Sequence, residues 1–309
     1  MLRYIKKGRI MKNLYKIIII VALTAAGICF SAGEKANFLW KVENAAGKDK
    51  VYLLGSVHIV PDDIYPLSRK ITDAYDSSAY VVVEADINNI DQAKVQQLTL
   101  EYGIYTDGST LQSELSETVY AKLAGFLKFT GMFTIDQMKP MKPWLAALMI
   151  PQLMISKMGY RMDNGIDMNF LRMAKRDKKS VFELESAEYQ IELLSSFTDE
   201  LQKKFLESTL DEIETFKEEF DSMIKAWRDD DVAKMEKILN DEYDNNPGLA
   251  AVYKKLVYDR NVSMTSKIDG YLKDKRKARF FVIVGAAHLI DKDGIVSMLE
   301  KKGYKVKKM

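Results

Sequence analysis

The chain has 309 residues, of which 47% are hydrophobic and only 6 are proline. This composition is typical of a globular protein that buries a large core, and it excludes disordered and collagen-like chains. Residues 34–309 contain 40 basic and 44 acidic residues, which gives this part a formal charge of −4. A mildly acidic chain lacks the basic surface that nucleic-acid binding requires, so we expect no nucleic-acid partner.

The first 33 residues have the pattern of an export signal. They contain six basic residues and no acidic one, and Ile17–Phe30 is an uncharged run that is followed by small residues at 31–33. This pattern predicts a secretory signal peptide, with Met11 as an alternative start. The other interpretation is an uncleaved N-terminal membrane anchor, although a span needs roughly 20 apolar residues. On both interpretations residues 34–309 lie outside the cytoplasm, periplasmic, extracellular or held to the membrane facing outward.

The first half of the exported part shows a strand–helix–strand pattern. Phe38–Val42 and Val51–Leu54 predict the two strands of a hairpin. Leu67–Tyr75 has helical spacing, and Tyr80–Val83 is an apolar, β-branched run that predicts a buried strand. A strand, a helix and a second strand in this order indicate a unit of a mostly parallel sheet.

Helical patterns dominate the middle of the chain. Residues 91–178 predict mainly helices, with a break at Met138–Trp144, where two prolines lie. Lys179–Leu184 predicts a short strand. Residues 187–277 are amphipathic and charge-rich, interrupted at Asn245–Gly248, and predict a helical layer or cap.

The C-terminal segment returns to the sheet. Arg279–Val284 predicts a buried strand, Asp293–Lys302 a helix, and Tyr304–Lys307 a terminal strand. We therefore expect one α/β domain over residues 34–309, with a mostly parallel central sheet flanked by helices and a large helical insertion or cap.

One motif occurs twice, and it contains both histidines of the chain. Val51–His58 and Phe281–His288 are each an apolar strand followed by Gly-x-x-His. The carboxyl ends of parallel strands meet where open α/β sheets bind ligands. Glu84 follows a third predicted strand and is expected at the same edge. Two imidazoles and a carboxylate in one place predict a divalent-metal site.

Simpler interpretations of these residues remain. A single histidine after a strand is more often structural than functional, and Glu84 is alternatively a solvated strand end or a helix-capping acid. The only cysteine, Cys29, lies in the N-terminal segment, so residues 34–309 offer no thiolate ligand or cysteine nucleophile.

The ordered set of motifs resembles the TraB/GumN family, which includes the pheromone-shutdown proteins and the Tiki metalloproteases. The resemblance extends over essentially all of residues 34–309. It is carried by Leu39–Val42, Val51–His58, Pro61, Tyr65–Leu67, Val82–Asp86, Lys142–Trp144, Gly165–Asp167, Leu184–Glu185, Arg260–Asn261 and Val284–Leu289.

The resemblance implies a fold related to the erythromycin esterase-like proteins. For the Tiki branch it implies a peptidase that depends on manganese or cobalt, with the positions of His58, His288 and Glu84 at the active site. Asp167, Glu185 and Arg260 match further polar positions of the family pattern.

The expected function is therefore metal-dependent hydrolysis of a peptide or a small ester or amide. The expected ligands of a manganese, cobalt or zinc ion are His58, His288, Glu84 and Asp167. Glu84, His58 and His288 are also the expected catalytic groups, together with Glu185 and Arg260.

Several roles stay open at this point. Glu84 is either a ligand or the general base, and Asp167 or Glu185 takes the other role or orients a histidine. Asp167 is alternatively a helix cap. Arg260 holds a developing oxyanion or a substrate carboxylate, or is an ordinary surface charge.

Two other functions compete with this one. The first is a non-catalytic protein that binds a peptide or signal outside the cytoplasm, for which the Met-rich stretch Met138–Met173 would suit a groove. The second is hydrolysis without a metal, with a histidine as general base. The N-terminal segment adds membrane association as a further expected interaction.

Overall fold

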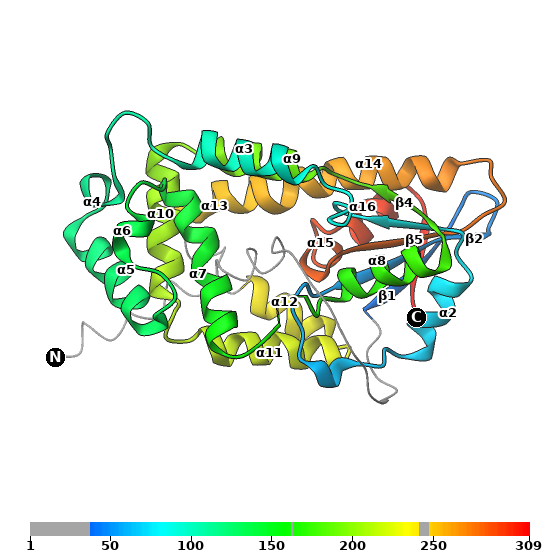
Figure 1. The fold of residues 1–309 in the computed structure, drawn as a ribbon. Helices are drawn as coiled ribbons and strands as arrows, with labels where there is room; N and C mark the ends of the chain where they lie inside the picture. The colour runs from blue at the N-terminus through cyan, green and yellow to red at the C-terminus, as the bar shows by residue number, and fades with distance from the viewer. Residues whose placement is uncertain (1–37, 162, 241–246) are drawn as a thin grey trace.

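The structure, a computed structural model, describes residues 38–161, 163–240 and 247–309. It is an α/β fold in which a six-stranded mixed sheet is flanked by helices, as Figure 1 shows. The predicted export segment, residues 1–33, lies outside the described residues. No helix in the described ranges is long and apolar enough to cross a membrane.

The sheet has the strand order β4-β3-β5-β2-β1-β6. Its strands are β1 (Leu39–Glu43), β2 (Asp49–Ser56), β3 (Tyr80–Val83), β4 (Ser180–Glu183), β5 (Phe280–Gly285) and β6 (Lys305–Lys308). The pairs β4–β3, β3–β5 and β5–β2 are parallel, whereas β2–β1 and β1–β6 are antiparallel. The expected mostly parallel sheet is thus a parallel block of four strands with β1 and β6 added at one edge. β1 is antiparallel to β2 because a hairpin joins the two strands, and β6 pairs antiparallel with β1.

The central strand β5 explains why helices cover both faces of this sheet. All six residues of β5 are buried, as expected for a strand in the middle of a parallel block. Phe281 packs against Tyr75 and Phe170 on one face, and Phe280 packs against Tyr271 on the other. Helices α2 (Arg69–Asp76) and α8 (Ile166–Asp177) therefore cover one face, and α14 (Asp259–Lys273) covers the opposite face.

The remaining helices form a layer beside the sheet (Figure 1). They are α3 (Gln92–Gly103), α4 (Leu111–Glu114), α5 (Glu117–Thr130), α6 (Ile135–Met138), α7 (Pro143–Lys157), α9 (Ala187–Ser195), α10 (Asp199–Asp211), α11 (Phe216–Arg228), α12 (Val232–Asn240) and α13 (Pro247–Tyr253). A 3₁₀ turn spans Asp62–Ile64 and a π turn spans Lys254–Tyr258. Helices α15 (Ala286–Leu289) and α16 (Ile295–Lys301) follow β5.

One hydrophobic core joins the helical layer to the sheet. Side chains from both parts belong to a single buried cluster. Trp227 of α11 makes the connection explicit, because its indole N–H donates a 2.7 Å hydrogen bond to the carbonyl of Gly55 in β2. This bond lies three residues before His58, so the helical layer helps to position the carboxyl end of β2.

Candidate functional site

The predicted polar residues lie at the carboxyl edge of the parallel block. Glu84 follows β3 directly, and Glu185 lies two residues after the end of β4. His58 lies two residues after β2, and His288 lies in α15, which begins immediately after β5. The four neighbouring strands β4, β3, β5 and β2 therefore each deliver one of these side chains to the same edge.

A buried arginine joins the two glutamates. Arg260 Nη2 donates to Glu84 Oε2 at 2.6 Å and to Glu185 Oε2 at 2.7 Å, and its Nε donates to the same Glu185 carboxylate at 2.9 Å. The Arg260 side chain is only 1% exposed, so it is not a surface charge. It is the second residue of α14, directly after the π turn Lys254–Tyr258, whose wider coil precedes the site.

Glu84 is ionised and fixed by this arrangement. Its Oε1 accepts a 2.7 Å hydrogen bond from the backbone N–H of Gly285. Burial raises the pKa of the Glu84 carboxyl, but the neighbouring His288, Arg260 and His58 and the Gly285 N–H together lower it to about 2. Glu84 is thus neither a solvated strand end nor a helix cap.

His288 is held as a neutral ring. Its Nδ1 lies 2.7 Å from Asn261 Oδ1, and the amide orientation of Asn261 is set because its Nδ2 donates to the carbonyl of Asp293 at 2.8 Å. Burial and the charge of Arg260 lower the pKa of His288 to about 3. A neutral ring that donates from Nδ1 carries its lone pair on Nε2.

His58 has a different partner, a carboxylate. Its Nδ1 lies 2.6 Å from Asp167 Oδ2, while Asp167 Oδ1 accepts from the Ser56 hydroxyl at 2.6 Å. Burial lowers the pKa of His58, and the charge and hydrogen bond of Asp167 raise it to a net value above 6.5. Asp167 lies inside α8, whose first turn packs on the His58 segment through the bond from Ile166 N–H to the carbonyl of Val57. It is therefore a partner of His58 and not a helix cap.

The Nε2 atoms of both histidines are buried, and neither has a hydrogen-bond partner among the described residues. A buried polar atom without a partner costs roughly 1–3 kcal/mol, so two of them in one site point to a ligand that completes them. Glu84 Oε1 lies 3.9 Å from His288 Nε2. The polar groups of the site thus converge on the two open imidazole nitrogens.

These nitrogens allow the predicted metal to be tested against the site. Imidazole Nε2 and carboxylate oxygen are suitable donors for manganese, cobalt or zinc, and rings held through Nδ1 are the usual arrangement of metal-bound histidines. In the described part of the chain, however, no group of three or more His, Cys, Asp or Glu side chains is already arranged around one ion position. The donor types fit a metal, and Glu84 would be the carboxylate among them.

Two residues of the site were missed by the sequence analysis as individual candidates. Ser56 is 2% exposed and donates to Asp167, the partner of His58, whereas Asn261 is 0% exposed and contacts the His288 ring directly. Ser56 lies within the first Gly-x-x-His motif, and Asn261 follows Arg260 in the family pattern. Their adjacency to named candidates was the signal that could have identified them.

Comparison with known proteins places the chain in a family. The model of the TraB/PrgY/gumN family matches residues 38–308. The chain is 26% identical over 254 residues to the uncharacterized protein YbaP of Escherichia coli (strain K12), and to that of Shigella flexneri, with 82% of this chain and 89% of each relative aligned. No solved structure matches the chain. Because the family model spans all six strands and every residue of the site, the chain belongs to the TraB/PrgY/gumN family.

Proposed function

We propose that this site hydrolyses an amide or ester bond, with a peptide-like substrate and a divalent metal ion. One observation carries the proposal. The two histidines of the chain reach one edge of the sheet beside an ionised glutamate, and their buried Nε2 atoms have no hydrogen-bond partner in the part of the chain that the structure describes. A purely structural histidine would be expected to have both nitrogens satisfied.

In this proposal His58, His288 and Glu84 hold the ion, which would be manganese, cobalt or zinc. When bound, such an ion polarises the substrate carbonyl and lowers the pKa of a bound water to about 7. Asp167 and Asn261 fix the two ring orientations through Nδ1, which leaves both Nε2 atoms to bind the ion.

Arg260 has a positioning role in this mechanism. Its Nε and Nη2 bind the two glutamates, and its Nη1 donates to the carbonyl of Leu256 at 3.2 Å. A guanidinium engaged on all three nitrogens keeps Glu84 ionised and oriented, which supports positioning and not direct binding of an oxyanion. Glu185 acts through Arg260, since its carboxylate binds the guanidinium side-on.

Hydrolysis without a metal is the second candidate, and one observation favours it. The carboxylate of Asp167 on His58 Nδ1 is the arrangement that prepares a histidine as a general base. In that case His58 Nε2 takes a proton from the attacking water. A peptide-binding protein is the third candidate. Met138, Met154 and Met168 of the Met-rich stretch are buried in the core, whereas four others are only partly buried, namely Met141, Met149, Met158 and Met173.

The proposal includes two further expectations of the sequence. Export through residues 1–33 places the site outside the cytoplasm, and N-terminal sequencing of the protein from the cell envelope tests whether the segment is removed. A relationship to the erythromycin esterase-like fold is supported by a parallel block whose polar site lies at its carboxyl edge.

Metal content is the decisive first measurement. The chain from residue 34 is purified without a polyhistidine tag, so that His58 and His288 are its only histidines. We expect about one equivalent of divalent metal in the parent chain after incubation with manganese, cobalt or zinc, and loss of that metal in His58→Ala and in His288→Ala. Glu212→Gln serves as the control, because Glu212 is 0% exposed but lies in the helical layer.

Activity then separates the three candidates. A peptide library and a set of simple esters are incubated with the metal-loaded protein, with and without chelator. Turnover that requires the metal supports the proposal, whereas chelator-resistant turnover that depends on His58 assigns the second candidate. Equal metal content in all four proteins, or none in any, removes the metal from the mechanism. Binding of a peptide without turnover under any condition assigns the third candidate.

A further inference from the structure

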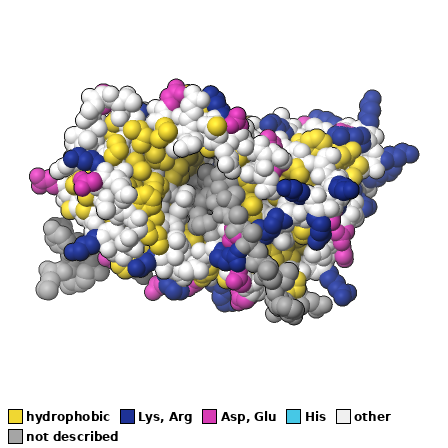
Figure 2. Space-filling model, viewed as in Figure 1, with side chains coloured by type: hydrophobic (Ala, Val, Ile, Leu, Met, Phe, Trp, Pro, Cys, Tyr) yellow, Lys and Arg dark blue, Asp and Glu magenta, His cyan; other side chains and the backbone are white. Residues whose placement is uncertain are grey.

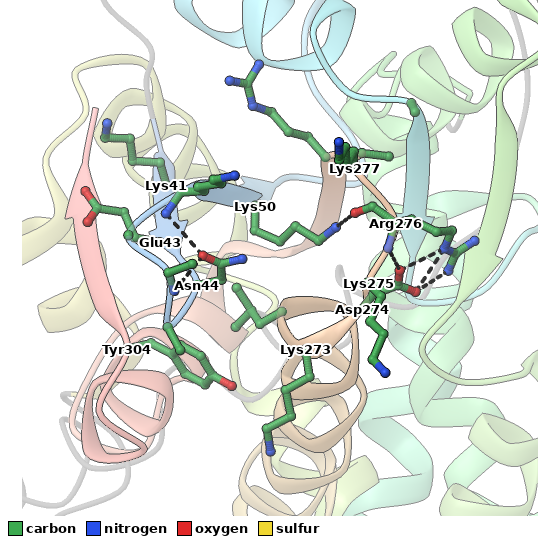
Figure 3. A pocket seen from close by; sticks show the side chains of 18 of the residues that line it. Lys41, Glu43, Asn44, Lys50, Lys273, Asp274, Lys275, Arg276, Lys277 and Tyr304 are labelled. Atoms are coloured by element: carbon green, nitrogen blue, oxygen red, sulfur yellow. Dashed lines mark hydrogen bonds and ion pairs between the residues drawn. The ribbon is translucent and has the colours of Figure 1, made fainter.

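A cavity lies at the opposite end of the parallel strands from the candidate site, and Figure 3 shows the side chains that line it. It has a volume of about 1290 Å³. Its walls come from the turn between β1 and β2 and from residues 273–279, which connect α14 to β5. Lys50 lines the cavity at the start of β2, and Ser56 marks the other end of that strand. Six residues of extended chain separate the two sites by about 20 Å.

The lining of this cavity is strongly basic. Eight of its side chains are basic and two are acidic. The basic residues are Lys41, Lys48, Lys50, Lys273, Lys275, Arg276, Lys277 and Arg279, and the acidic residues are Glu43 and Asp274. The rest of residues 34–309 contains 32 basic and 42 acidic residues, so the positive charge is concentrated here in an otherwise acidic chain. Figure 2 shows Lys and Arg side chains gathered at the end of the molecule where α14 runs into β5.

The two acidic side chains offset only part of the positive charge of this lining. Asp274 accepts two hydrogen bonds from Arg276 Nε and a third, of 2.6 Å, from its Nη2. Glu43 Oε2 lies 3.1 Å from the ammonium nitrogen of Lys305, a residue that does not line the cavity. Within the described ranges, Lys48, Lys275 and Lys277 have no carboxylate partner, and all three are exposed.

Two basic side chains of the lining are held by contacts within the protein. The Arg276 guanidinium lies over the rings of Tyr80 and Phe280, 4.6 and 5.4 Å from their centroids. Lys50 is only 5% exposed, and its ammonium donates to the carbonyl of Arg276 (Figure 3). Burial of this ammonium lowers the pKa of Lys50, an effect that a bound anion would oppose.

We propose that this cavity binds a ligand that carries several phosphate groups. Lysine ammonium groups act as point charges that suit phosphate oxygens, and the exposed Lys48, Lys275 and Lys277 around one hollow match a ligand with three or more negative charges. A concave wall with fixed Arg276 and Lys50 favours a compact ligand over a flat membrane surface. The position of β1 supports this choice. Leu39 pairs with Leu54, so the chain enters the sheet at the end away from the cavity, and an anchor that precedes β1 would not bring the cavity to a membrane.

Isothermal titration of the full-length, untagged protein with inorganic tripolyphosphate tests the proposal. We expect saturable one-to-one binding that weakens as salt is added, since exposed charges are screened. The double variant Lys275→Gln/Lys277→Gln should weaken binding about tenfold, because two exposed charge contacts of ordinary strength combine to that factor. The control Lys128→Gln/Lys175→Gln removes the same charge from exposed positions on α5 and α8 and should bind as the parent does.

The outcomes separate this inference from the proposed hydrolase function. His58→Ala should bind tripolyphosphate as tightly as the parent chain, since the two sites lie at opposite ends of β2. No binding at low salt, or equal weakening in both double variants, overturns the proposal. Sedimentation with phosphatidylglycerol vesicles in the absence of any binding to tripolyphosphate also overturns it, because the lysines would then serve a lipid surface.

Discussion

The two histidines of the site share one motif but differ in the group that holds Nδ1. Asp167 is a carboxylate and favours the charged form of His58, whereas the Asn261 amide and the nearby Arg260 favour the neutral form of His288. The sequence shows two identical Gly-x-x-His patterns and gives no sign of this difference. The motifs do not reveal the difference because the partners lie outside them: Asp167 is 109 residues from His58, and Asn261 is 27 residues from His288.

This difference predicts opposite pH effects on the stability of the metal-free protein. The folded-state pKa of His288 is about 3, below the unfolded value of 6.5. The unfolded state therefore binds a proton at a higher pH than the folded state does, and the free energy of unfolding falls as the pH drops from 6.5. The folded-state pKa of His58 is raised above 6.5. Its contribution to the free energy of unfolding is therefore complete below pH 6.5 and is lost as the pH rises through the folded-state pKa. Each proton contributes a slope of at most about 1.4 kcal/mol per pH unit.

Urea denaturation across the pH range measures both effects. His288→Gln should flatten the pH dependence below 6.5, and His58→Gln should flatten it above 6.5. The experiment is done in chelator, so that metal binding does not contribute. Identical changes in the two variants would show that the rings are not differentiated in this way.

The triad of Glu84, Arg260 and Glu185 predicts a strong stability effect. Arg260→Ala leaves two buried carboxylates without their counter-charge, and breaking a buried ion pair from one side typically costs about 3–5 kcal/mol. Arg176→Ala is the control, because Arg176 pairs with Asp177 at the surface and should leave the urea midpoint unchanged. A small effect of Arg260→Ala would mean that the two glutamates are neutral or solvated.

At the scale of elements, the buried strands were the most predictable part of the fold. Tyr80–Val83 has the predicted bounds, and Arg279–Val284 is shifted by one residue to Phe280–Gly285. Short apolar runs that are bounded by polar residues mark such strands clearly. The antiparallel pairing of β6 with β1 was not predictable, because Lys305–Lys308 is a charged edge strand whose partner is set only by the fold.

The local structure around the site was less predictable than its strands. The short helix Ala286–Leu289, which contains His288, was not predicted, and the π turn Lys254–Tyr258 has no sequence pattern of its own. The meeting of the strand ends at one edge was predictable, because parallel strands have their carboxyl ends on the same side of a sheet. The ion pair between Glu84 and Arg260 spans 176 residues and was not predicted, since the family resemblance indicated both residues but not their contact.

The packing of α8 on the His58 segment gives a prediction at this scale. A Cβ on Gly165 would lie 2.2 Å from the carbonyl oxygen of His58, so Gly165→Ala must push α8 away from that segment. The shift moves Asp167 from His58 Nδ1, and we expect lower stability together with a loss of metal affinity of at least about tenfold, as for other changes to groups that orient a ligand. Metal titration and urea denaturation measure the two effects.

Gly125→Ala is the matched control for this substitution. Gly125 lies on the exposed side of α5, and a Cβ there meets nothing within 4 Å. Alanine in the middle of a helix should stabilise the protein by roughly 0.5–1 kcal/mol and leave metal binding unchanged. If Gly165→Ala behaves like Gly125→Ala, the close contact between α8 and His58 is not a constraint on the site.

At the scale of the whole molecule, the helical layer and the sheet should unfold together. They share one buried cluster, and Trp227 bonds to Gly55 while its ring stacks against Phe38 at 6.5 Å. A continuous core makes it unfavourable to expose one part alone, so we expect a single transition despite the length of the chain. Hydrogen exchange pulse-labelling in urea should give the same midpoint for peptides from β5 and from α7.

A substitution in the helical layer tests this cooperativity directly. Leu123 is fully buried in α5, far along the chain from the sheet strands, and Leu123→Ala should cost roughly 2–5 kcal/mol through the cavity that it creates. If the molecule is one cooperative unit, the midpoints measured at β5 and at α7 fall by the same amount, because the strand ends that carry His58 and His288 cannot stay folded without the layer. A fall at α7 alone would show that the sheet and its site are stable independently, and the layer would then be a separable cap.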